Sequence, residues 1–146
     1  MNNFIFENSS KVYFGEGCVK EYLSNILSAY GDTVMLCYGG GSIKKNGIYD
    51  EVITVLKKEN KAVVEFSGIP SNPTYSKVLE GVKLAKESNA DLILAVGGGS
   101  VMDCCKAISL CAKYDGDIWA DFWARPGVID FEPLPLGIIV TVSGTG

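Results

Sequence analysis

Histidine is absent from all 146 residues of this chain. Its absence removes the commonest general base and the commonest metal ligand of proteins. Basic residues are the minority, 13 against 17 acidic residues, and the net charge of −4 argues against a nucleic-acid-binding surface. No apolar run approaches the roughly 20 residues that span a bilayer, and the first residues lack the basic start of a signal peptide. We therefore expect a cytoplasmic protein with no nucleic-acid and no membrane partner.

The sequence lacks a C-x-x-C pair, and its cysteines are odd in number. One cysteine falls in an expected buried strand and three fall on the apolar stripe of an expected helix. We interpret these thiols as small core residues that stay reduced. A metal or redox site built from them is the alternative. The five are Cys18, Cys37, Cys104, Cys105 and Cys111.

The chain does contain one short unit twice: an apolar run followed by Gly-Gly-Gly-Ser. The first apolar run covers 34–38 and its glycine turn covers 39–42; the second run covers 92–96 and its turn covers 97–100. A strand that ends in glycines and leads into a helix leaves bare N–H groups at the positive end of the helix dipole, and the missing Cβ atoms admit an anion. Two such turns indicate a ligand with more than one phosphate, and a dinucleotide is the first candidate.

Strands and helices alternate along the chain. Alternation of side-chain type predicts a strand over 10–14, and apolar runs predict strands over 34–38, 62–66, 92–96 and 137–141. Helical spacing of apolar residues predicts helices over 19–27, 48–56, 75–88 and 101–112. Lys57, Lys58 and Lys61 follow the second helix, where cations suit the dipole. Residues 114–135 are irregular and aromatic, and we interpret them as a packed surface loop, with a substrate or partner surface as the alternative.

This alternation predicts one α/β domain, a doubly wound and mostly parallel sheet. Ligands of such sheets bind at the carboxyl ends of the strands. Tyr38, Val96 and Thr141 lie at such ends, so three loops are expected to converge on one crevice.

Neither glycine turn is a G-x-G-x-x-G fingerprint or a P-loop. Asp103 follows Ser100 by three residues and fits either a capping box or a place near the ribose or nicotinamide. At the first turn no carboxylate ends the strand, and Ser42 and Lys44-Lys45 follow. A hydroxyl and two ammonium groups suit a 2′-phosphate and favour NADP over NAD. The alternative is that both lysines only solvate the start of a helix.

Several segments together resemble the iron-containing (group III) alcohol dehydrogenase family, in particular its NADPH-dependent butanol dehydrogenase and aldehyde reductase branch. The resemblance covers the whole chain, and its end at Thr141-Val-Ser-Gly-Thr-Gly146 is similar to the start of a T-x-x-x-T-G-S-E motif. It implies a dehydroquinate synthase-like N-terminal nucleotide-binding domain over 1–146. The other matching segments are 11–15, 38–50, 68–74 and 94–103.

The resemblance also implies cofactor-binding roles. Residues 39–42 would bind the adenosine 2′-phosphate, and residues 98–100 would bind the pyrophosphate. Thr141 and Thr145 would line the nicotinamide end. Asn72 would contact the adenosine side and Asp103 would lie near the nicotinamide ribose. With Lys44 from the charge argument, the candidate residues are Gly39, Gly40, Gly41, Ser42, Lys44, Asn72, Gly98, Gly99, Ser100, Asp103, Thr141 and Thr145.

Members of this family hold a divalent metal, usually iron or zinc, with an aspartate and three histidines of a helical C-terminal domain. None of those positions lies in this chain, so we expect a fragment that is inactive alone. The implied whole enzyme transfers hydride between NADP(H) and a small alcohol or aldehyde such as butanol or butanal. A homodimer through the strand near 12–14 is also implied. The alternatives are a non-catalytic nucleotide-binding fragment and another enzyme of the superfold, such as an NAD-dependent glycerol dehydrogenase or a dehydroquinate synthase.

Overall fold

A four-stranded parallel sheet forms the centre of the computed structural model, which describes residues 10–124 and 129–142. The strand order is β2-β1-β3-β4. The strands are β1 (Thr33–Tyr38), β2 (Ala62–Phe66), β3 (Leu92–Gly97) and β4 (Leu136–Val140). Four of the five predicted strands are confirmed, each to within one residue at either end.

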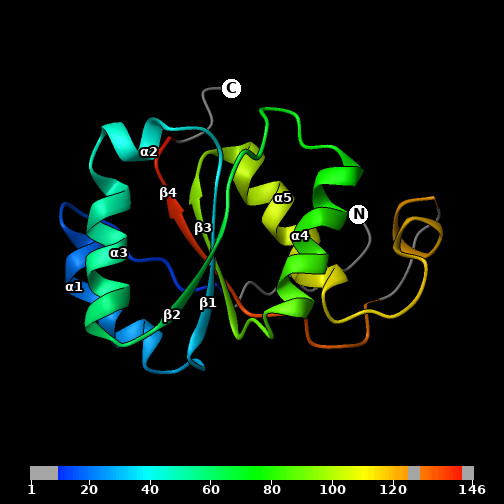
Figure 1. Ribbon diagram of the computed structural model, residues 1–146, viewed down its shortest axis with the longest axis horizontal. Helices are drawn as coiled ribbons and strands as arrows, with labels where there is room; N and C mark the ends of the chain where they lie inside the picture. The colour runs from blue at the N-terminus through cyan, green and yellow to red at the C-terminus, as the bar shows by residue number, and fades with distance from the viewer. Residues whose placement is uncertain (1–9, 125–128, 143–146) are drawn as a thin grey trace, which may run out of the picture.

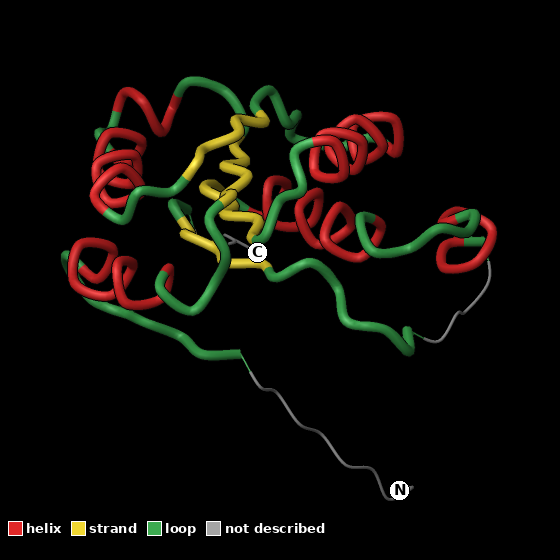
Figure 2. The backbone as a smooth tube through the Cα atoms, turned by 60° about the horizontal axis from the view of Figure 1, so that its bottom comes forward, coloured by secondary structure: helices red, strands yellow, loops and turns green. Residues whose placement is uncertain are grey.

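Helices cover both faces of this sheet (Figures 1 and 2). On one face lie α1 (Cys18–Leu27), the short α2 (Ser42–Lys45) and α3 (Ile48–Lys58). On the other face lie α4 (Tyr75–Glu87) and α5 (Gly99–Cys111), with the hydroxyl of Thr74 accepting a capping hydrogen bond from the Lys77 N–H. The doubly wound α/β architecture is confirmed.

Alternate residues of the central strands serve the two helix layers. In β1, Met35 and Cys37 face α4 and α5, whereas Leu36 and Tyr38 face α1 and α3, and all four are buried. Burial of each large apolar side chain contributes about 1.5–3 kcal/mol. A strand covered on both sides therefore has to be apolar at every position, which is why β1 and β3 show no polar alternation.

The cysteines confirm the core interpretation. Cys37, Cys104, Cys105 and Cys111 are free and buried in the cluster between the sheet and α4–α5. Burial raises the pKa of Cys104 and Cys111 to about 11. A thiol with a raised pKa stays protonated and is a poor metal ligand or nucleophile.

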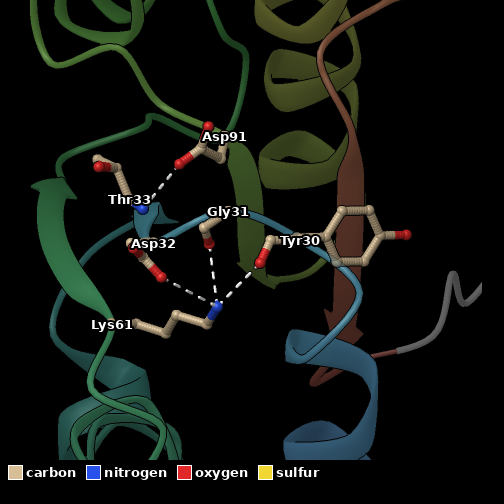
Figure 3. A network of polar contacts seen from close by, with 6 residues as sticks. All are labelled: Tyr30, Gly31, Asp32, Thr33, Lys61 and Asp91. Atoms are coloured by element: carbon tan, nitrogen blue, oxygen red, sulfur yellow. Dashed lines mark hydrogen bonds and ion pairs between the residues drawn. The ribbon is translucent and has the colours of Figure 1, made fainter.

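Polar contacts close the amino ends of the strands (Figure 3). The Lys61 ammonium donates hydrogen bonds to the carbonyl oxygens of Tyr30 and Gly31 at 2.9 and 3.0 Å. The Asp91 carboxylate accepts a 2.9 Å hydrogen bond from the Thr33 N–H. Lys61 was predicted as a cation for the end of α3, but α3 ends at Lys58, so Lys61 binds the α1–β1 loop instead.

The predicted strand over 10–14 is wrong. These residues have no regular secondary structure, and the side chains of Val12 and Phe14 are 83% and 98% exposed. A strand needs a neighbouring strand for its backbone hydrogen bonds, and the sheet of the described residues contains only β1 to β4. The dimer contact near 12–14 that the resemblance implies stays a prediction.

The aromatic segment after α5 is less irregular than predicted. It includes a single π-helical turn, η1 (Trp119–Trp123), whose two tryptophans are about half exposed and lie near the Tyr75 ring. Across the described residues, no helix is both long and apolar enough to cross a membrane.

Candidate nucleotide-binding site

The loops that follow the strands meet along one edge of the sheet. In the register, Tyr38 lies beside Val96, which lies beside Ile139 of β4. The Thr141 N–H donates a 3.0 Å hydrogen bond to the Gly97 carbonyl oxygen. These pairings bring together the ends of β1, β3 and β4, as predicted.

A fourth loop, after β2, joins the same edge. Its Gly68 N–H donates a 2.9 Å hydrogen bond to the Gly39 carbonyl oxygen, and the Ser100 hydroxyl donates to the carbonyl oxygen of Ser71. This loop thus bridges the two glycine turns, and the exposed Asn72 sits within it. All four loops contribute main chain to one surface.

The second glycine turn leads directly into a long helix. Gly97 ends β3, Gly98 is the N-cap residue, and α5 then runs for 13 residues. The first intrahelical bond is donated by the Val101 N–H to the Gly98 carbonyl oxygen. The N–H groups before Val101 therefore lie at the positive end of the helix dipole, where anions bind well.

The first glycine of each turn is explained by packing. A Cβ atom on Gly97 would lie 2.6 Å from Cγ2 of Val101, and one on Gly39 would lie 3.2 Å from the Ile69 carbonyl oxygen. A side chain at Gly97 would therefore force Val101 to move, and one at Gly39 would fit only tightly against the loop after β2.

The later glycines have no such explanation. A Cβ atom on Gly40, Gly41 or Gly99 would meet nothing within 4 Å. None of the three has a φ angle in the left-handed region that favours glycine. Neither backbone conformation nor packing requires glycine there, whereas close approach of an anion to the main chain does. The main chain at these three glycines therefore fits a phosphorylated ligand.

The two turns differ in the helix that follows. Gly41 is the N-cap of α2, which is only four residues long, and α3 begins after Gly47 with its φ of +81°. The exposed Ser42 is the first residue of α2. Because dipoles add along a helix, α2 offers an anion less stabilisation than α5 does.

The Lys44 side chain is exposed, yet its ammonium lies close to two aromatic rings. Its ammonium lies 4.6 Å from the ring centre of Tyr49 and 5.3 Å from that of Tyr38. Both tyrosine hydroxyls donate hydrogen bonds to the Glu65 carboxylate, at 2.5 Å from Tyr38 and 2.6 Å from Tyr49. These contacts lower the pKa of Glu65 and raise that of Tyr49 to about 12.

Sequence reasoning missed Glu65. No carboxylate ends β1, as noted, but Glu65 lies next to the end of the neighbouring strand β2. The available signal was a single acidic residue in an otherwise apolar strand. The role of this residue could not be predicted from one segment, because it depends on the pairing of β2 with β1, which brings Leu36 beside Glu65.

The capping-box interpretation of Ser100 and Asp103 is wrong. Ser100 is the second residue of α5, and its hydroxyl bonds to the loop after β2, so Gly98 is the cap. The exposed Asp103 carboxylate lies 3.7 Å from the Lys106 ammonium. Thr141 is placed beside Gly97, whereas Thr145 lies outside the described residues.

A cavity of about 440 Å³ lies beside α5, lined by Asp103 and Leu110 of this helix, Trp123 of η1 and Leu136 of β4 among others. The aromatic segment thus faces the same helix that starts at the second glycine turn. Within residues 10–124 and 129–142, no three His, Cys, Asp or Glu side chains gather where they could hold a metal ion.

Known proteins resemble this chain in sequence and in fold. It is 48% identical over 146 residues to a Bacillus subtilis protein named "Probable NADH-dependent butanol dehydrogenase 1", and 37% identical over 149 residues to an NADPH-dependent aldehyde reductase of Escherichia coli. The crystal structure of an NADH-dependent butanol dehydrogenase A from Thermotoga maritima superposes with a TM-score of 0.87 at 42% identity.

These similarities cover nearly all of this chain but only part of each known protein. The alignments with the two curated relatives include all of this chain but only 37% of each relative. The superposition on the Thermotoga maritima structure includes 99% of this chain and 36% of that structure. The family model described as "Iron-containing alcohol dehydrogenase" matches residues 9–146. The chain belongs to the iron-containing alcohol dehydrogenase family.

Proposed function

We propose that this chain is the cofactor-binding part of an NADP(H)-dependent, metal-requiring alcohol dehydrogenase or aldehyde reductase. One observation carries the proposal: Gly40, Gly41 and Gly99 line open space with ordinary backbone angles. Glycines that the fold does not need, at the carboxyl ends of parallel strands, are suited to bind phosphate.

The residues divide along the ligand. The N-terminus of α5 with Gly98, Gly99 and Ser100 would hold the pyrophosphate. Residues 39–42 and Asn72 would bind the adenosine side, and Asp103 with Thr141 and Thr145 the nicotinamide side. The bound nicotinamide would supply the hydride chemistry, and the names of the relatives suggest a small primary alcohol or aldehyde as the substrate.

The preference for NADP(H) rests on the first turn. The Ser42 hydroxyl and the Lys44 cation suit a 2′-phosphate, and residues 38–42 include no carboxylate to accept a hydrogen bond from a ribose 2′-hydroxyl. The relatives' names include both NADH-dependent and NADPH-dependent enzymes, so the choice calls for a direct test.

Calorimetric titration of the chain with NADPH and NADH in parallel provides that test. We expect tighter binding of NADPH, weakened severalfold by Ser42→Ala. Ser28→Ala, an exposed serine at the end of α1, is the matched control and should change nothing. Tighter binding of NADH would overturn the cofactor preference, and binding of neither would overturn the proposed site.

For the chain alone we propose nucleotide binding without turnover. The support is the lack of a metal-holding group among the described residues, in a family whose name includes iron. We expect no formation of NADPH when butanol and NADP⁺ are added with Fe²⁺ or Zn²⁺. Measurable turnover under these conditions would contradict this proposal.

A further inference from the structure

We propose that Glu65, together with Tyr38 and Tyr49, sets nucleotide specificity by holding the Lys44 ammonium in competition with a 2′-phosphate. The inference rests on the proposed function, because it requires a nucleotide at the first glycine turn. It adds a positioning role for a cluster of side chains that belongs to neither glycine turn.

The carboxylate of Glu65 is held at both of its oxygens. Oε2 accepts the hydrogen bond from Tyr38 and Oε1 the one from Tyr49. The two rings in turn meet edge to face, with centres 5.8 Å apart and planes at 71°. Hydrogen bonds to a charged acceptor are the strong ones, so three elements, β1, β2 and α3, fix the position of this negative charge.

Lys44 completes the cluster from α2, two residues after Ser42. Its ammonium lies over the faces of both tyrosines. Contact with Tyr38 and the nearby charge of Glu65 raise the pKa of Lys44. The electron-rich rings and the carboxylate therefore attract the same cation that a 2′-phosphate would attract.

A competition follows from this placement. A phosphate beside residues 39–42 binds Lys44 fully only if the ammonium leaves the tyrosine rings, and the Glu65 charge opposes the phosphate directly. A nucleotide without the 2′-phosphate meets neither penalty. Glu65 thus lowers NADPH affinity through Lys44, unlike a strand-end carboxylate that binds the ribose hydroxyls itself.

Glu65→Gln tests this competition, because it removes the charge and keeps the shape. We expect the NADPH dissociation constant to fall about threefold to fivefold, the scale of an exposed charge interaction, while that for NADH changes less than twofold. The gain should vanish near 1 M salt, where the Debye length is about 3 Å. Glu87→Gln removes an equal charge from the far end of α4 and should leave the ratio of the two constants unchanged.

A double-mutant cycle with Lys44→Met isolates the route through Lys44. In the Lys44→Met background, Glu65→Gln should yield less than half of its NADPH gain, since the competing cation is gone. A full gain in that background would overturn the role of Lys44. If Glu65→Gln does not fold, Glu65→Thr, a neutral residue suited to a strand, replaces it.

The outcomes separate the inference from the proposed function. If the unaltered chain binds nucleotide and Glu65→Gln leaves the NADPH to NADH ratio unchanged, the inference is overturned and the proposed function stands. If the unaltered chain binds neither nucleotide, the proposed function fails and the inference fails with it.

Discussion

The two ends of the sheet differ in how their polar groups are used. At the amino ends, the Lys61 side chain is only 7% exposed and bonds to two loop carbonyls, while Asp91 accepts from the Thr33 N–H (Figure 3). At the carboxyl ends, Gly40, Gly41 and Gly99 border open space. One sheet therefore has an end closed by its own side chains and an end left open.

Glycine shows the contrast at a single residue type. A Cβ atom on Gly31, at the closed end, would lie 2.3 Å from Cγ of Asp91, whereas a Cβ atom on Gly99 would touch nothing. A glycine at the closed end serves the fold, and we infer that one at the open end serves a ligand. Adding a methyl group at each end should thus affect different measurements.

Gly99→Ala should have the largest effect, and only on binding. The new methyl group would occupy the space proposed for the pyrophosphate, so we expect nucleotide affinity to fall at least 30-fold, about 2 kcal/mol. The free energy of unfolding should stay constant or rise by up to about 1 kcal/mol, because alanine is the better helix former. Calorimetry with NADPH and urea unfolding measure the two quantities.

Gly116→Ala is not a suitable control for that change, because its Cβ would lie 2.5 Å from the Tyr114 ring. Gly40→Ala is a second test of the same idea, since it also adds a methyl group in open space, but at the adenosine side. Loss of NADPH affinity in both variants with unchanged stability is the expected pattern. Unimpaired binding by Gly99→Ala would mean that α5 does not receive the phosphates.

Gly31→Ala should have the opposite profile. The methyl group forces the exposed Asp91 carboxylate to move and to release the Thr33 N–H. Loss of a hydrogen bond to a charged group costs about 1–2 kcal/mol of the free energy of unfolding. Nucleotide affinity measured on the folded protein should stay within twofold of the original, and a weakened affinity would show that the two ends are coupled.

The sequence was sufficient to predict this open end but not the closed one. Strands 34–38 and 92–96 are apolar at every position and end in glycines, so both their burial and their turns follow from local pattern. Residues 10–14 also have a strand-like sequence pattern, but they have no neighbouring strand in the described sheet and form no strand. Pattern alone predicts which residues can form a strand, and pairing decides which do.

Side-chain partners across elements were beyond local reasoning. From its position after α3, Lys61 is expected to interact with the helix dipole. Its ammonium instead donates hydrogen bonds to the carbonyl oxygens of Tyr30 and Gly31, which lie about 30 residues earlier in the chain. Glu65 likewise acquires its partners because β2 pairs with β1 and α3 packs above them. Each contact depends on strand register, a long-range property that no spacing within one segment encodes.

Lys61→Met should test the closed end more gently than Gly31→Ala. Methionine keeps the apolar stem and removes the ammonium, so the Tyr30 and Gly31 carbonyls must find water instead. Both residues are exposed, which limits the expected loss to about 1 kcal/mol of the free energy of unfolding. Lys57→Met at the end of α3 is the matched control. Equal losses in urea unfolding would show that Lys61 acts only on the helix dipole.

The smallest expected effect is a pH dependence at the open end. The hydrogen bond to Glu65 raises the pKa of Tyr49 to about 12 from 10.0, so the folded chain keeps this proton longer than the unfolded chain does. The stabilisation is therefore complete below pH 10 and is lost as the pH rises from 10 to about 12. Because Tyr49 is partly open to solvent, the loss should stay below about 1 kcal/mol.

Tyr49→Phe removes this proton and should flatten the pH dependence of unfolding above pH 10 relative to the original chain. Tyr30→Phe, at the closed end, should leave the dependence unchanged, since the contact of Tyr30 with Lys61 is made by its carbonyl oxygen. Titration by phenolate absorbance gives an independent reading: Glu65→Gln should return the pKa of Tyr49 toward 10.0. If Tyr49→Phe and the original chain lose stability in parallel, the Glu65 carboxylate does not hold Tyr49 in solution, and the cluster beside the first glycine turn loses one of its two tyrosine donors.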